Sequence, residues 1–212
     1  MYKSPMGQKA LPFAISQFYG AIMRQTALAA LSVLAILLCA IAALGQSVPA
    51  DSMKVDYFAN ANTGAPDGTL RLTNPGTAAG NVCASIYVFD PQQEMSECCS
   101  CYLSPDGLRT LSVNTDLTSN PLTGASLTTG TIKIVSTIPV SGTCPQYPVA
   151  VSPESALRAW TTHLQVSGLA TTETPSQDAT LTLAEMKRLE KGCYSIQIAG
   201  SGHGVCTCGV GD

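Results

Sequence analysis

The chain has 212 residues, of which only 12% are charged, about half the share that is usual in soluble proteins. Eleven lysine and arginine residues against fourteen acidic residues give a formal net charge of −3. This balance excludes a basic surface of the kind that binds nucleic-acid phosphates, so we expect no nucleic-acid partner.

Residues 1–45 are predicted to form an export signal. Residues 27–44 are an uncharged apolar run that follows the positive Arg24, and small residues precede the expected cleavage site before Gln46. Met23 offers an alternative start, because a signal needs none of the residues before it. An uncleaved membrane anchor is the competing interpretation, since the run is just long enough to span a bilayer. The polar, proline-containing sequence that follows favours cleavage.

Removal of residues 1–45 leaves 167 residues with a net charge of −6 and eight cysteines. We expect this product to be secreted or to lie on the extracellular surface, with no membrane contact after signal cleavage. Residues 46–68 are predicted to form an N-terminal strand and linker, and residues 69–212 a disulfide-rich β domain. The pattern loosens near residue 140, which favours a separate, looser C-terminal subdomain.

The first half of the β domain alternates between short strands and turns. Residues 53–58 partly alternate between polar and apolar side chains, and residues 59–68 are rich in loop-forming types. Residues 69–73 alternate as a strand, and Asn74-Pro75-Gly76 is typical of a type II turn. Residues 82–89, VCASIYVF, are predicted to be a strand that is buried on both faces.

The pattern continues with a cysteine-rich strand over residues 95–103, a turn at 104–107 and a strand over 108–113. A long polar loop over 114–130 and a strand over 131–138 follow. Turn signals every 8 to 12 residues between short strands indicate a sandwich or barrel. We therefore expect a mostly β fold, a disulfide-stabilised antiparallel sandwich that is compatible with an immunoglobulin-like arrangement.

The last third of the chain contains one predicted helix near residues 183–191. Thr182 and Glu185 form a capping box, basic residues follow, and Gly192 is expected to end the helix. Residues 193–199 are then predicted to return as a strand. The stretch that starts near Ser152 fits either a helix or a strand, and its β-branched residues favour a strand from Arg158 onward.

The even number of cysteines in an exported chain indicates a disulfide framework. Counting does not reveal the pairing, but a turn at residues 90–93 would place Cys83 opposite Cys101 in a hairpin. A register slip of one residue would move Cys83 to the other face. The eight predicted half-cystines are Cys83, Cys98, Cys99, Cys101, Cys144, Cys193, Cys206 and Cys208.

The same cysteines, together with His163 and His203, could instead hold zinc. Structural zinc sites favour two or more residues between paired cysteines, and the two C-x-C pairs here match that spacing poorly. We therefore expect disulfides, no metal and no cofactor, and we expect both histidines to be ordinary strand or surface residues.

Two groups of residues carry side chains of the types that act in catalysis. Ser201 and His203 lie in a glycine-rich segment, residues 200–204, which lacks the G-x-S-x-G order and is more typical of a turn or bulge. Asp90, Glu94 and Glu97 flank a proline turn and are expected to form its solvated rim. No residue is assigned a catalytic role, and the chain is not expected to be an enzyme.

Two stretches carry a resemblance. Residues 83–124, from CASIYVFDPQQEMSECCSC to SNPLTG, resemble a stretch of uncharacterised exported bacterial proteins, which implies no activity. Residues 70–90, LRLTNPGTAAGNVCASIYVFD, resemble an early hairpin of immunoglobulin-like bacterial surface domains. The second resemblance implies a sandwich in which these residues form two paired strands.

Three functions are compatible with this chain. Serine and threonine make up 38 of the residues after position 45, against 22 charged residues, which suits an extracellular protein that adheres or assembles. The leading hypothesis is a structural, self-associating filament or surface-layer subunit in which residues 53–58 pair with a neighbouring copy, with Met53, Val55 and Tyr57 on one apolar face. For the strand itself, pairing within its own domain is the favoured alternative, because sequential strands usually neighbour each other. A secreted carbohydrate- or protein-binding module is the alternative, and a secreted hydrolase is the third.

Overall fold

The computed structural model describes residues 48–78, 80–119, 126–145, 151–164, 171–199 and 206–208. The predicted export signal over residues 1–45 lies outside this part of the chain. In the part described, no helix is long and apolar enough to cross a membrane.

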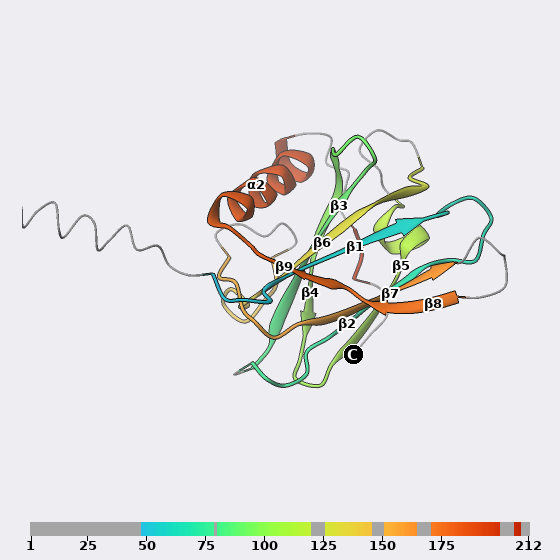
Figure 1. The fold of residues 1–212 in the computed structure, drawn as a ribbon. Coiled ribbons are helices and arrows are strands. Elements are labelled where there is room, and N and C mark those ends of the chain that lie inside the picture. Colours follow the sequence, from blue (N-terminus) through green and yellow to red (C-terminus); the bar gives the residue numbers. More distant parts are fainter. Residues whose placement is uncertain are drawn as a thin grey trace, which may run out of the picture. The chain divides into compact units, whose positions relative to one another are not determined.

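The described strands form two antiparallel sheets, which confirms the predicted sandwich (Figure 1). The first sheet has the order β4-β3-β6-β1-β9 and comprises β1 (Met53–Ala59), β3 (Val82–Phe89), β4 (Met95–Leu103), β6 (Thr129–Thr137) and β9 (Gln177–Ala179). The second has the order β5-β2-β7-β8 and comprises β2 (Thr69–Thr73), β5 (Leu108–Ser112), β7 (Arg158–Leu164) and β8 (Thr171–Pro175).

Strand β3 is buried along its whole length, as its continuous apolar run predicts. Alternate side chains of a strand point to opposite faces. Ile86 therefore packs in the core between the sheets with Leu72 of β2 and Ile134 of β6. Tyr87, one residue further on, packs in a second apolar cluster on the outer face of the first sheet.

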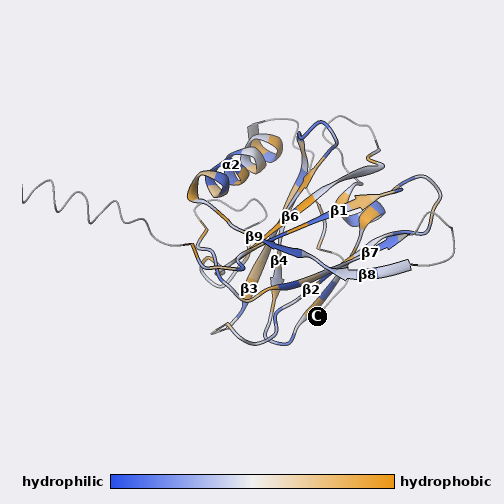
Figure 2. Cartoon of the chain, viewed as in Figure 1, coloured by the Kyte–Doolittle hydropathy of each residue, from blue (hydrophilic) through white to orange (hydrophobic). Residues whose placement is uncertain are grey.

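Helix α2 (Leu183–Tyr194) covers part of that outer face. The predicted capping box is confirmed, because the Thr182 side chain accepts a hydrogen bond from the backbone N–H of Glu185. Figure 2 shows hydrophobic and hydrophilic residues side by side along α2. Its apolar residues Leu189 and Cys193 are fully buried.

The predicted end of this helix at Gly192 is wrong, and so is the predicted strand over residues 193–199. The helix continues to Tyr194 and then into a π-helical turn, η2 (Ser195–Ala199). Gly192 lies inside the helix, at a place where an added Cβ would meet the Met95 Cε at 2.8 Å. Cys193 and Ile196, three residues apart, both reach the apolar cluster under the helix.

Other local predictions have mixed outcomes. Gly76 has a φ of +74°, as the predicted type II turn requires. The predicted polar loop over residues 114–130 contains a π-helical turn, η1 (Val113–Leu117), which begins after Ser112. Strands β2 and β3 lie in different sheets, so residues 70–90 do not form the hairpin that the resemblance implies.

The chain from residue 171 to 179 crosses from one sheet to the other (Figure 1). Strand β8 pairs with β7 in the second sheet, and β9 pairs with β1 in the first. Lys54 of β1, whose side chain is buried, forms an ion pair with Asp178 of β9. The chain beyond residue 140 thus contributes to both sheets, and its described part does not separate into the expected C-terminal subdomain.

All eight cysteines after residue 45 form disulfides, which confirms the predicted framework. The pairs are Cys83–Cys144, Cys98–Cys193, Cys99–Cys206 and Cys101–Cys208. The sulfur atoms of Cys99, Cys101 and Cys208 lie within 4.8 Å of one another. This metal-like spacing follows from two adjacent bridges, because Cys99 and Cys101 share one face of β4.

The predicted pair of Cys83 and Cys101 is wrong, and a β-bulge explains the error. Next to the turn, Phe89 lies opposite Met95, a register that would place Cys83 opposite Cys101. The register shifts between Val88 and Phe89, and Val88 lies opposite Glu97. Cys83 consequently lies opposite Tyr102 instead of Cys101.

Candidate functional site

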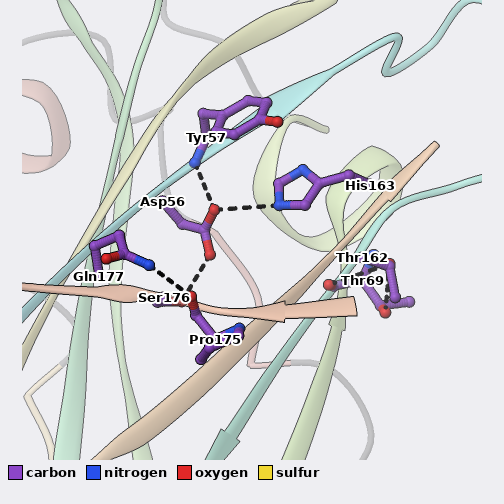
Figure 3. A network of polar contacts seen from close by, with 8 residues as sticks. All are labelled: Asp56, Tyr57, Thr69, Thr162, His163, Pro175, Ser176 and Gln177. Carbon is purple, nitrogen blue, oxygen red and sulfur yellow. Dashed lines mark hydrogen bonds and ion pairs between the residues drawn. The ribbon is translucent and has the colours of Figure 1, made fainter. Parts of the chain in front are cut away.

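A cluster of buried and partly buried polar side chains lies where the chain crosses between the two sheets (Figure 3). Asp56 of β1 is at its centre. Its Oδ2 accepts a 2.7 Å hydrogen bond from the hydroxyl of Ser176, the residue between β8 and β9. Its Oδ1 accepts a 2.8 Å bond from the backbone N–H of Tyr57 and lies 3.5 Å from Nε2 of His163 on β7. One carboxylate therefore joins three segments of the fold.

The alternation of β1 positions these groups. Asp56 and Phe58 are buried, whereas Tyr57 between them is 57% exposed. Strand β9 pairs with β1 only over Met53–Val55, so among the described residues no strand pairs with β1 on that side at Tyr57. The Asp56 carboxylate accepts this N–H and so replaces the missing strand at this position.

The exposed ring of Tyr57 stacks on the imidazole of His163, with ring centroids 4.4 Å apart and an interplanar angle of 21°. Because Asp56 contacts His163 and the Tyr57 backbone, the carboxylate fixes both parts of this stack. Tyr57 thus presents an aromatic surface to solvent while its ring stacks on His163.

Hollows adjoin this stack on two sides. The larger one, about 530 Å³, lies between β1 and the β8–β9 segment, and we call it the seam groove. Besides Asp56, Tyr57 and His163, its lining includes hydroxyl and amide side chains. These are Thr131, Thr172, Thr174 and Gln177. A smaller hollow of about 210 Å³ lies between the stack, Thr162 and the loop that contains Pro66.

The described contacts favour a structural role for the carboxylate over nucleophilic catalysis. A serine nucleophile needs a base that accepts its proton, and that base in turn needs an orienting group. Here the Ser176 hydroxyl donates to Asp56, and His163 contacts the same carboxylate. Asp56 lies in the middle of the three residues, where a histidine would be required.

The predicted assembly strand pairs within its own domain, which is the alternative that the sequence favours for it. Strand β1 lies inside its own sheet, paired with β6 along its length and with β9 over its first three residues. Met53 is buried in the cluster under α2, and Val55 is partly buried. Of the three predicted contact residues, only Tyr57 is exposed.

The candidate catalytic residues do not form a site in the described part of the chain. Ser201 and His203 lie outside them. Asp90 accepts a hydrogen bond from the N–H of Glu94 and stabilises the turn, as expected for its rim. The prediction is wrong for Glu97, which is fully buried because it lies on the same face of β4 as Cys99.

Sequence reasoning missed the cluster around Asp56. The sequence feature that could have indicated this cluster is the pair of charged residues Lys54 and Asp56, at alternate positions of an otherwise apolar strand. Both residues contact the crossing segment, Lys54 through Asp178 and Asp56 through Ser176. His163 was predicted only to be a strand or surface residue, and it does lie on a strand.

Comparisons of this chain with protein-family models, with curated proteins and with solved structures found no match.

Proposed function

We propose that this protein is an exported binding module that holds a saccharide in the seam groove. The observation that carries the proposal is the Tyr57 ring, which is exposed and stacks on His163 beside a groove of hydroxyl and amide side chains. Binding sites typically combine an aromatic surface with a few well-placed polar groups.

The chemistry of the groove fits a hydroxyl-rich ligand. A sugar ring has an apolar face that packs on an aromatic ring, and hydroxyl groups at its edge that donate and accept hydrogen bonds. Thr172, Thr174 and Gln177 can act as both donors and acceptors. These side chains carry no charge, and they remain bonding partners across a wide range of pH.

The disulfides support the export part of this proposal. Four bridges in one small chain indicate that it folds in an oxidising environment. Export and an extracellular location remain predictions that rest on residues 1–45. Self-assembly through β1 becomes the less favoured hypothesis, because this strand already has partners within its own sheet.

The test is a glycan array probed with the protein and two single-site variants. Tyr57→Ala removes the aromatic surface, and Tyr102→Ala removes another exposed tyrosine, which is on β4. We expect the Tyr57→Ala variant to bind its best glycan at least about tenfold more weakly, equivalent to roughly 1.4 kcal/mol. Tyr102→Ala should bind like the unchanged protein.

Two outcomes would contradict the proposal. The first is that the protein retains no glycan on the array. The second is that it binds a glycan and Tyr57→Ala binds equally well. Thermal unfolding of both variants shows whether they fold, so that a loss of binding is assigned to the groove.

A further inference from the structure

A second pocket of about 260 Å³ adjoins the seam groove, and we call it the cation pocket. Its lining comprises Phe89, Asp90, Gln93, Thr131, Lys133 and Arg188. Thr131 lines both the cation pocket and the seam groove. The two hollows are therefore neighbours on the outer face of the first sheet.

The strand register explains why they adjoin. Tyr57 of β1 and Phe89 of β3 both lie opposite Thr131 of β6. The three residues thus form a row across three adjacent strands, about 10 Å from end to end at the usual strand spacing. One end of this row is the exposed aromatic ring of Tyr57, and the other end carries two cations.

Those cations are held in place by one carboxylate and one aromatic ring. Glu185 accepts hydrogen bonds of 2.7 Å from Lys133 and of 2.8 Å from both Nε and Nη2 of Arg188. The Lys133 ammonium lies 5.3 Å and the Arg188 guanidinium 5.6 Å from the centroid of the Phe89 ring. These contacts fix both positive groups before any ligand arrives.

Both cations keep donors beyond those that Glu185 accepts. The described contacts use two of the five N–H groups of Arg188 and one of the three of Lys133. Asp90 also lines the pocket, but its Oδ1 accepts the N–H of Glu94 in the turn. Glu185 is not part of the lining, so two cations face the pocket beside one carboxylate.

We propose that the ligand of the seam groove is an acidic polysaccharide whose sugar carboxylate binds Lys133 and Arg188. This inference rests on the proposed function and names the class of its ligand. One sugar of the polysaccharide packs on Tyr57, and the polysaccharide then passes Thr131. A uronic-acid carboxylate further along it accepts hydrogen bonds from N–H groups of Lys133 and Arg188 that Glu185 does not use. Charge-assisted bonds of this kind are stronger than those between neutral groups, and they discriminate against an uncharged sugar.

The probes are polygalacturonate and its fully methyl-esterified form, which share a backbone; the ester replaces each negative carboxylate by an uncharged methyl ester. Affinity is measured by isothermal titration with the full protein. We expect polygalacturonate to bind at least about tenfold more tightly than the ester. Its affinity should fall as salt is added, because exposed charges are screened.

The matched variants are Arg188→Gln and Lys187→Gln, which remove the same charge from neighbouring positions of α2. Arg188→Gln should lose most of the preference for the acid, whereas Lys187→Gln, an exposed residue outside the pocket lining, should keep it. Equal binding of acid and ester would overturn the inference. So would a preference for the acid that Arg188→Gln leaves unchanged, or binding that is confined to neutral glycans.

Failure of the underlying function would look different. If neither polygalacturonate nor any glycan on the array binds, the proposed function fails together with the inference. If neutral glycans bind in a manner that depends on Tyr57, the proposed function stands and only the acidic ligand class is excluded.

Discussion

The hydroxyl of Ser176 and the carboxylate of Asp56 form a 2.7 Å hydrogen bond between residues 120 positions apart in the chain. This bond attaches the segment between β8 and β9 to β1 just beyond Val55, where the pairing of β9 with β1 ends. Ser176→Ala should therefore lower the free energy of unfolding by about 1–3 kcal/mol, because a buried acceptor loses its donor. Urea denaturation measures the change.

The control for this prediction is Ser155→Ala, which removes the hydroxyl of an exposed serine. It should change the stability by less than about 0.5 kcal/mol. Equal stabilities of the two variants would show that the bond between Ser176 and Asp56 contributes little.

Gly130 is a position at which an added methyl group should destabilise the protein. A Cβ at this residue would lie 2.2 Å from the carbonyl oxygen of Phe89 and 2.7 Å from the ring of Phe58. Gly130→Ala should lower the free energy of unfolding by about 1–3 kcal/mol, because backbone must move to make room. Gly80→Ala is the matched control, since an added Cβ there meets nothing within 4 Å. A Gly130→Ala variant as stable as the control would contradict this close approach.

The bridge between Cys98 and Cys193 fixes α2 to the first sheet. Replacing both cysteines by serine should cost about 2–4 kcal/mol. Hydrogen exchange should also quicken in peptides from Leu183–Tyr194, because a helix of this length is marginal without its packing. The double serine variant at Cys83 and Cys144 removes a bridge elsewhere, and it should leave exchange in α2 unchanged.

Acid should weaken the hydrogen bonds of Glu185, which join it to Arg188 within α2 and to Lys133 of β6. Its hydrogen bond to Arg188 is the largest of several causes that lower the pKa of this carboxyl from 4.5 to about 2. A depressed carboxyl pKa contributes stability above pH 4.5, and the contribution is lost as the pH falls towards 2. Because the group is partly exposed, we expect a loss below about 1 kcal/mol.

Urea denaturation between pH 6 and pH 2 tests this prediction. In Glu185→Gln the free energy of unfolding should not include the acid-induced loss that comes from this carboxyl. The difference in the free energy of unfolding between the wild type and this variant should therefore shrink as the pH falls. Arg188→Gln, which removes the largest cause of the shift, should show an intermediate dependence. If the free energies of unfolding of the wild type and Glu185→Gln differ by the same amount from pH 6 to pH 2, the acid-induced loss does not come from Glu185.

Local patterns in the sequence were sufficient for much of the fold. The apolar run of β3, the turn at Gly76 and the cap at Thr182 each depend on residues within a few positions, and each was predicted. The pairing of Cys83 was missed because one bulge shifts the register of β3 against β4. Gly192 is of the residue type that usually ends a helix, and its local window does not reveal that the helix continues to Tyr194.

The candidate site could not be predicted from local patterns either, because its residues are far apart in the sequence. Asp56, His163 and Ser176 belong to three distant segments, and only the crossing of β8 and β9 between the sheets brings them together. Tyr57 was predicted to contact a partner, but its stacking on His163 could not be read from either neighbourhood.

The connectivity of the disulfides has a consequence for the order of oxidative folding. Each bridge joins one of the first four cysteines of the β domain to one of the last four. Counted along the chain, the first cysteine pairs with the fifth, the second with the sixth, the third with the seventh and the fourth with the eighth. As the chain is synthesised from its N-terminus, every bridge that closes before Cys144 emerges is therefore non-native. Such bridges must be exchanged through a free thiolate before the native set can form. Recovery of folded protein should thus depend more on a catalyst of disulfide isomerisation than on the strength of the oxidant.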